Sequence, residues 1–87
     1  MLIRSQDKSR LINLDNTQEL RFWECAQGFG ITDCVCTIGY YSTKAKAMKV
    51  LDMIQEAYET YEYEKAFKTV LTLFETFQMP EDSEVEV

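Results

Sequence analysis

The sequence contains no histidine, only one proline and only three glycines. Histidine is the commonest general base in enzymes, so its absence removes the usual activator of a nucleophilic cysteine. With so few glycines, no stretch matches a phosphate-binding loop. We therefore expect a protein without enzymatic activity and without a bound cofactor.

Cysteines are also few, and their number is odd. Cys25, Cys34 and Cys36 could supply three thiolates, but a structural zinc site usually takes four cysteine or histidine ligands, and Cys-x-Cys is not the usual spacing. Three cysteines fit a reducing compartment better than a disulfide scaffold. We expect small buried thiols beside Trp23 and no metal site; zinc copurifying with the chain would contradict this.

Long apolar runs are missing as well. Residues 1–8 lead directly into polar residues and lack the apolar region of about 7 to 15 residues that a secretory signal carries. No run approaches the ~18 apolar residues that a membrane-spanning helix needs. We expect a cytoplasmic protein that does not enter a membrane.

The charge is unevenly distributed. The net charge is -6: residues 1–49 carry seven basic and five acidic groups, whereas residues 50–87 carry two basic and ten acidic groups. An acidic second half repels a phosphate backbone, so nucleic acid is an unfavourable partner. At 87 residues and 46% hydrophobic content, the chain predicts one small folded domain that association would stabilise further.

The first half of the chain is rich in β-forming residues. Residues 1–16 contain two short apolar runs around a polar stretch at Asp7-Lys8, a pattern that predicts a strand, a turn and a strand. A second hairpin is expected around residues 27–30, where Gly28 and Gly30 can adopt the positive φ of a tight turn.

A turn at Gly28-Phe29 would set the register of this hairpin. Trp23 would then oppose Cys34, and Arg21 would oppose Cys36. Because side chains alternate across a strand, one face would hold Trp23, Cys25, Cys34, Cys36 and Ile38. We expect that face to be core and the opposite face, with Phe22, Ala26, Ile31 and Val35, to be a partner surface. A slip of one residue would exchange the two roles.

The clearest element is a helix within residues 40–62, capped by Ser42 or Thr43. Its apolar residues recur at the helical period and predict one buried stripe: Ala47, Val50, Leu51, Ile54, Ala57, Tyr58 and Tyr61. A second helix is expected over about residues 63–75, although that segment also contains many β-favouring residues. An extended segment at residues 77–79 then precedes Pro80.

These elements predict an α+β fold, with a small antiparallel sheet of three to four strands packed against one or two C-terminal helices. Residues 1–79 are expected to form a single domain, and residues 80–87 an acidic, mobile tail.

The charges of the helix oppose its dipole, because its lysines precede its glutamates. Each opposed exposed charge costs only about 0.3 to 1 kcal/mol, whereas burial of each large apolar side chain contributes about 1.5 to 3 kcal/mol. Packing therefore tolerates the arrangement. Lys44, Lys46 and Lys49 surround free N-H groups and form a candidate anion site, although a solvated helix end is the simpler interpretation.

Aromatic residues provide the candidate partner surface, because tyrosine buries area at interfaces while keeping a polar tip. The candidates are Phe22, Tyr40, Tyr41, Tyr61 and Tyr63. The helix is basic at one end and acidic at the other, which suits steering towards a charged partner or association with another copy. We expect a homo-oligomer.

Three blocks of the sequence, MLIRSQDK, YYSTKAKAMKVLDMIQEAY and FQMPEDSEVEV, resemble a family of small proteins without an assigned activity. The family is encoded in low-GC Gram-positive bacteria and in their phages and mobile elements. The resemblance implies a β-rich N-terminal part, a helix, a final extended segment and a phage or mobile-element setting. It transfers no catalytic residue, and residues 17–38 and 62–76 lie outside it.

Together these observations predict a non-enzymatic interaction protein that binds a surface on a host protein or on another copy of itself, with an anti-defence inhibitor as one version. The alternative is an oligomeric binder of a small anionic ligand such as a nucleotide, using the lysines at the start of the helix.

Overall fold

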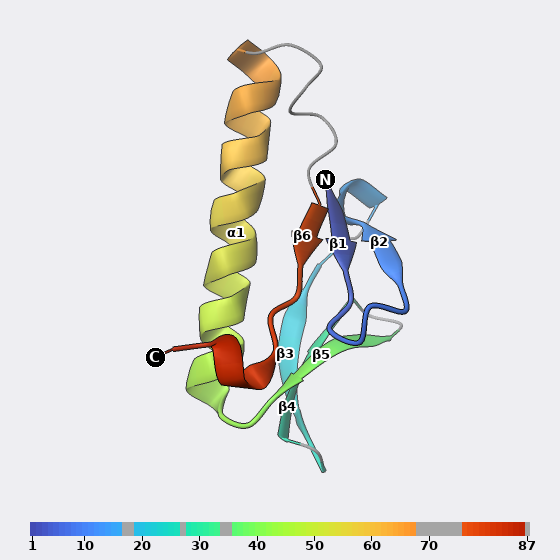
Figure 1. Ribbon diagram of the computed structural model, residues 1–87, viewed down its shortest axis with the longest axis vertical. Coiled ribbons are helices and arrows are strands. Elements are labelled where there is room, and N and C mark those ends of the chain that lie inside the picture. Colours follow the sequence, from blue (N-terminus) through green and yellow to red (C-terminus); the bar gives the residue numbers. More distant parts are fainter. Residues whose placement is uncertain (17–18, 27, 34–35, 68–75, 87) are drawn as a thin grey trace.

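The computed structural model describes residues 1–16, 19–26, 28–33, 36–67 and 76–86. In chain order, the elements are β1 (Leu2–Arg4), β2 (Leu11–Asn13), η1 (Leu14–Asn16), β3 (Arg21–Cys25), β4 (Gly28–Thr32), β5 (Thr37–Tyr41), α1 (Lys44–Phe67), β6 (Thr76–Gln78) and η3 (Asp82–Glu84). The predicted α+β class is confirmed: two three-stranded sheets accompany one long helix (Figure 1).

The first sheet has the order β2-β1-β6. Strands β1 and β2 form the predicted strand-turn-strand, with Ile3 opposite Ile12. Asp7 holds the turn, because its Oδ1 accepts hydrogen bonds from Ser5 Oγ at 2.7 Å and from Ser9 N at 3.0 Å. These bonds, those from Ser9 first, lower the pKa of Asp7 to about 2.

Strand β6 brings the end of the chain back beside its beginning. It pairs parallel to β1, with Phe77 opposite Ile3, and the amide of Met79 continues the contact by donating to Arg4 O at 3.0 Å. The extended conformation expected at residues 77–79 is thus present. Its partner strand lies more than 70 residues away, which local sequence pattern cannot indicate.

The second sheet, β3-β4-β5, is antiparallel throughout. The predicted register of its hairpin is wrong. Cys25 lies opposite Gly28, and Trp23 lies opposite Gly30, so the chain reverses before Gly28 rather than at Gly28-Phe29. Gly28 is the first residue of β4, and its φ of 122° is one that other residues rarely adopt.

The roles of the two hairpin faces are also exchanged. The observed register differs from the predicted one by an even number of residues, so Trp23 and Cys25 still share one face and Phe22 lies on the other. However, Phe22 and Phe29 pack with buried Ile31 against the core, while Trp23 is 45% exposed. The reason is that Trp23 faces a glycine across the strand pair, which leaves little apolar surface there to bury.

Gln6 joins the two sheets through its backbone and its side chain. Its backbone N-H donates to Ile38 O at 2.8 Å, its Nε2 donates to Tyr40 O at 3.0 Å, and its Oε1 accepts from Tyr40 N at 2.9 Å. The free edge of β5 is therefore covered by the turn between β1 and β2. An uncovered edge would be a site for unwanted strand pairing.

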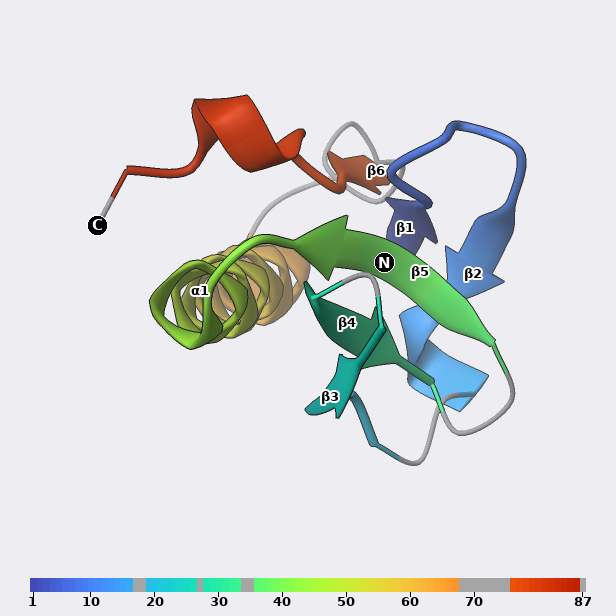
Figure 2. The same ribbon diagram turned by 90° about the horizontal axis from the view of Figure 1, so that it is seen from below.

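Helix α1 begins where the sequence predicts. Thr43 caps it, since Thr43 Oγ1 accepts from Lys46 N at 3.1 Å. Its buried stripe includes Ala47, Val50 and Ile54 and packs on β4 and β5. Figure 2 shows the helix end-on beside this sheet, with β1 and β2 beyond β5. The helix continues through residues 63–67, so no separate helix starts at 63; residues 68–75 lie outside the described ranges.

The C-terminal residues differ from the expected mobile tail. Val85 is only 5% exposed and belongs to the core, and Pro80 O accepts a hydrogen bond from the buried Tyr41 hydroxyl at 2.8 Å. Residues 80–86 are acidic, as expected, but they are anchored to the same body as the preceding 79 residues. The segment is held by the buried side chain of Val85, by the hydrogen bond to Pro80 O and by the Asp82 carboxylate, which accepts hydrogen bonds from Ser42.

Candidate functional site

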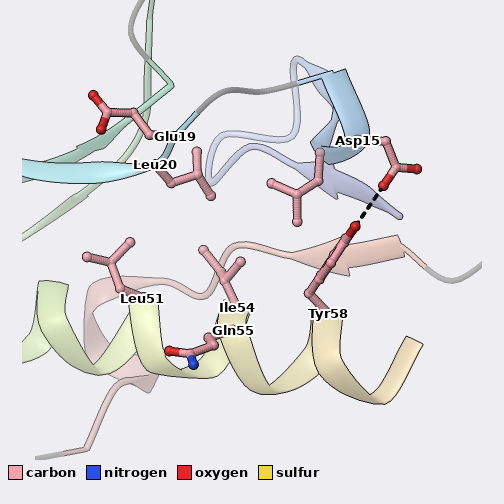
Figure 3. A pocket seen from close by; sticks show the side chains of 8 residues that line it. Asp15, Glu19, Leu20, Leu51, Ile54, Gln55 and Tyr58 are labelled. Carbon is pink, nitrogen blue, oxygen red and sulfur yellow. Dashed lines mark hydrogen bonds between the residues drawn. The ribbon is translucent and has the colours of Figure 1, made fainter. Parts of the chain in front are cut away.

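A groove of about 520 Å³ opens between α1 and the segment that leads from η1 to β3 (Figure 3). Its lining residues are Leu14, Asp15, Glu19, Leu20, Leu51, Ile54, Gln55 and Tyr58. The helix supplies one wall and the β-rich half of the chain supplies the other. The groove therefore depends on the packing of α1 for its shape.

The floor and inner walls of the groove are apolar. Leu51 and Tyr58 are seven residues apart, so they project from the same side of the helix two turns apart. Leu20 approaches from the opposite wall (Figure 3). Leu14 also lines the groove, and all four of these side chains are half-buried. Half-buried leucines on facing walls leave apolar surface that a further protein segment could cover.

One end of the groove is closed by a hydrogen bond. The Tyr58 hydroxyl donates to Asp15 Oδ1 at 3.1 Å, shown as the dashed line in Figure 3. Hydrogen bonds to Glu62 and Asp15 raise the pKa of Tyr58 to about 12, so the phenol remains a donor at neutral pH. The amino group of Met1 lies 3.4 Å from Asp15 Oδ2 on the other side of that carboxylate.

The mouth of the groove is acidic. Asp15 and Glu19 line it, Glu59 accepts a hydrogen bond from Gln55 at 2.9 Å, and no lysine or arginine is among the described lining residues. Apolar walls with an acidic mouth attract a segment that carries apolar side chains flanked by positive charge.

The described cysteines give no metal centre. Cys25 and Cys36 are free and half-buried, and no three His, Cys, Asp or Glu side chains gather into a possible metal site within the described ranges. Cys34 lies outside those ranges, so the expectation that the three cysteines hold no metal stays a prediction.

The three lysines predicted as an anion site are not brought together. Lys44 Nζ lies 5.3 Å from the centre of the Phe22 ring, and Lys49 is exposed. Lys46 turns towards the C-terminal segment, where its Nζ lies 2.9 Å from Asp82 O and 3.4 Å from Asp82 Oδ2.

The start of α1 nevertheless holds an anion, and that anion is Asp82. Its Oδ1 accepts from Ser42 N at 2.7 Å and from Ser42 Oγ at 3.1 Å. The hydrogen bond from the Ser42 backbone is the main cause of the lowered pKa of Asp82. The chemistry expected at the helix start is thus present, but the chain supplies its own carboxylate. Sequence reasoning missed Asp82 because it placed this residue in a mobile tail.

Three of the five aromatic residues predicted to bind a partner lie in or against the core instead of on an accessible surface. Tyr41 is 1% exposed and Tyr61 is 6% exposed, and Phe22 packs against the core beneath Lys44. The helical spacing already placed Tyr61 on the buried stripe, and that prediction is confirmed. Tyr41 lies on the inner side of β5, which the sequence pattern did not distinguish from an outer position. Tyr40 and Tyr63 remain accessible, at 40% and 65%.

A second accessible aromatic surface lies on the outer face of the β3-β4-β5 sheet. Trp23 lies over Gly30, where an added Cβ would come within 2.8 Å of the indole nitrogen, and its Nε1 donates to Thr37 Oγ1 at 3.3 Å. Tyr40 is paired with Gly30 on the far side. Trp23 was not predicted as a surface residue, and the glycine opposite it is the signal that could have indicated this.

Comparison with known proteins found no match: no family model, no curated protein and no solved structure resembles the chain at a significant level. Within the described residues, no helix is both long enough and apolar enough to cross a membrane.

Proposed function

We propose that this chain is a small non-enzymatic interaction protein that acts by binding a protein surface through the groove beside α1. The observation that carries the proposal is the pair of half-buried leucine walls, Leu51 facing Leu14 and Leu20, beneath an acidic mouth. An open apolar groove in such a small domain is a typical binding surface for another protein segment.

The chemistry around the groove supports binding over catalysis. The carboxylate of Asp15 contacts both the Tyr58 hydroxyl and the Met1 amino group, so it is already engaged within the chain. We infer that it does not serve as a general base for a bound substrate.

The proposal includes a setting. The setting is a phage or mobile element, and it rests on the resemblance of three sequence blocks alone, since no family model matches the chain. In such a context, a small protein of this kind would inhibit a host defence protein by covering its surface.

The alternative function, binding of a nucleotide or another small anion, is less favoured. Its ligand would have to compete with Asp82, whose carboxylate already accepts hydrogen bonds from Ser42 and contacts Lys46. An intramolecular carboxylate has a high effective concentration and is displaced only by a tightly bound ligand.

Groove substitutions with matched controls test the proposal. Leu51→Asp places a charge on the apolar wall, and Gln55→Lys places a cation at the mouth on an exposed position that tolerates it. Ala45→Lys makes the same neutral-to-cation change on an exposed position of α1 outside the lining.

We expect both groove variants to weaken association at least ~10-fold, whether the partner is another copy of the chain or a protein purified after capture from a host lysate. Ala45→Lys should bind as the wild type does. Sedimentation measures association with another copy, calorimetry measures binding to the captured protein, and circular dichroism verifies that each variant is folded. Equal binding by all four chains would overturn the proposal.

A further inference from the structure

One stripe of α1 is accessible along the groove side of the helix. Its positions recur at alternating spacings of four and three residues, the 3.5-residue repeat of a helix seam that packs against another helix. We call it the outer seam; it consists of Lys44, Met48, Leu51, Gln55, Tyr58 and Glu62. Leu51, Gln55 and Tyr58 are also the groove residues that α1 contributes, together with buried Ile54 beneath them.

Side chains of the outer seam remain partly or fully open to solvent. Lys44, Met48 and Gln55 are exposed, and Leu51, Tyr58 and Glu62 are half-buried. The seam therefore has apolar residues in its middle, a cation at its first position and a carboxylate at its last. It spans nineteen residues, from Lys44 to Glu62, which is about 27 Å of helix.

The residues of the seam are complementary to those of a second, antiparallel copy of the same seam. If two copies of α1 lie antiparallel with facing residues whose numbers sum to 106, Lys44 meets Glu62 and Met48 meets Tyr58. Leu51 then meets Gln55, next to the two-fold axis. Each of these contacts occurs twice, because a two-fold axis repeats it. A parallel arrangement would instead place Lys44 beside Lys44 and Glu62 beside Glu62.

We propose that the groove is filled by α1 of a second copy of this chain, forming an antiparallel, two-fold symmetric dimer along the outer seam. The inference rests on the proposed function and names its partner. Two observations support the dimer. The charges of the seam are complementary to those of an antiparallel copy, and Lys44 of the other copy would approach the acidic end of the groove at Asp15.

The dimer also gives the reversed charges of the helix a role. Lysines at the start of α1 and glutamates later in α1 oppose the dipole within one chain, but each end meets the opposite charge in an antiparallel partner. The central Gln55 would fix the register, since a polar residue in an apolar seam disfavours slipped pairings.

Charge exchange tests this arrangement. Lys44→Glu and Glu62→Lys both improve the match to the helix dipole. Lys44→Glu also removes the contact with the Phe22 ring, and Glu62→Lys removes a hydrogen bond to Tyr58, so circular dichroism must show that each variant is folded. Each variant alone would place like charges together at both ends of its homodimer. A mixture of the two variants, however, would restore opposite charges at both ends.

Sedimentation of the full chain gives the readout. We expect the wild type to dimerise, each single variant to raise the dimer dissociation constant at least ~10-fold, and the equimolar mixture to form a heterodimer close to wild-type affinity. Lys49→Glu makes the same charge change on an exposed position outside the seam and should leave dimerisation unchanged.

Two outcomes would overturn the dimer. One is a wild type that stays monomeric at high concentration, and the other is a pair of single variants that dimerise as well as the wild type. If the wild type is monomeric but Leu51→Asp still abolishes binding to a captured protein, the proposed function holds and only its partner changes. If groove substitutions change neither self-association nor binding to a captured protein, the dimer and the proposed function both fail.

Discussion

The start of α1 and its groove side differ in whether another part of the chain already occupies them. At the start of the helix, Thr43 caps the amide of Lys46, and Asp82 accepts from the amide of Ser42 and contacts the Lys46 ammonium group. Along its groove side, the apolar walls at Leu51 and Leu20 have no covering segment among the described residues. The sequence offered the charged end as a candidate anion site, yet the apolar side is the one that no described segment covers.

The residue that occupies the helix start, Asp82, lies far from it along the chain. Asp82 reaches the helix start because β6 pairs with β1 and returns the chain to that side of the molecule (Figure 1). A charged helix end is therefore weak support for a ligand site until the far end of the chain has been placed.

The largest expected effect comes from detaching the C-terminal segment at Tyr41. Tyr41→Ala removes a buried ring and the hydrogen bond to Pro80 O, and should lower the free energy of unfolding by about 3 to 5 kcal/mol. Urea denaturation measures it. Tyr40→Ala, on the neighbouring exposed tyrosine of the same strand, should change the unfolding free energy by less than about 1 kcal/mol. Similar losses in both variants would mean that Tyr41 does not anchor the segment.

A smaller effect is expected from Asp82→Asn. The amide keeps the shape but loses the charge that faces Ser42 N and Lys46, which should cost about 1 kcal/mol of stability. Glu86→Gln is the control, because it removes an equal charge from an exposed residue of the same segment. If the two variants unfold at the same urea concentration, the helix start is not held by Asp82.

Acidification should affect the two carboxylates that the fold holds ionised. The pKa of Asp7 is lowered to about 2 from an ordinary value of 3.8, and that of Asp82 is also lowered. A depressed folded-state pKa stabilises the fold above the unfolded-state value, and this stabilisation is lost as pH falls through the folded-state value. Urea midpoints between about pH 4 and pH 2 should therefore converge for wild type, Asp7→Asn and Asp82→Asn. Differences that stay constant across this range would contradict the assignment.

The smallest effect concerns the closed end of the groove. In the wild type, Tyr58 should ionise only near pH 12, because its proton is shared with Glu62 and Asp15. Nuclear magnetic resonance of the tyrosine ring carbons follows this ionisation, and Tyr58→Phe identifies the resonance by its loss. An ionisation of Tyr58 near pH 10 in the folded protein would show that the contact with Asp15 does not persist in solution.

The helix and its buried stripe could be predicted because they depend on local periodicity. Ala47, Val50 and Ile54 repeat at the helical period, Thr43 supplies a cap, and the packing of these residues outweighs the unfavourable charges. The α+β class followed from the same local patterns.

The hairpin register, the anchored C-terminal segment and the groove could not be predicted in this way. The turn position depended on which of two glycines takes a positive φ, and Gly28 does so as the first residue of β4. Asp82 and Leu20 become important only through contacts with α1 from opposite ends of the chain. The tyrosines illustrate the same limit, since Tyr40 and its neighbour Tyr41 point to opposite sides of β5.

The most direct test of the contrast between the two features of α1 is a concentration series followed by amide resonances of the uniformly labelled chain. We predict that, as the concentration rises, the amides around Leu51, Gln55 and Tyr58 shift while those of Ser42 and Lys46 stay in place. Shifts confined to residues 42–46, or the same spectrum at every concentration together with unimpaired partner binding by Leu51→Asp, would contradict it.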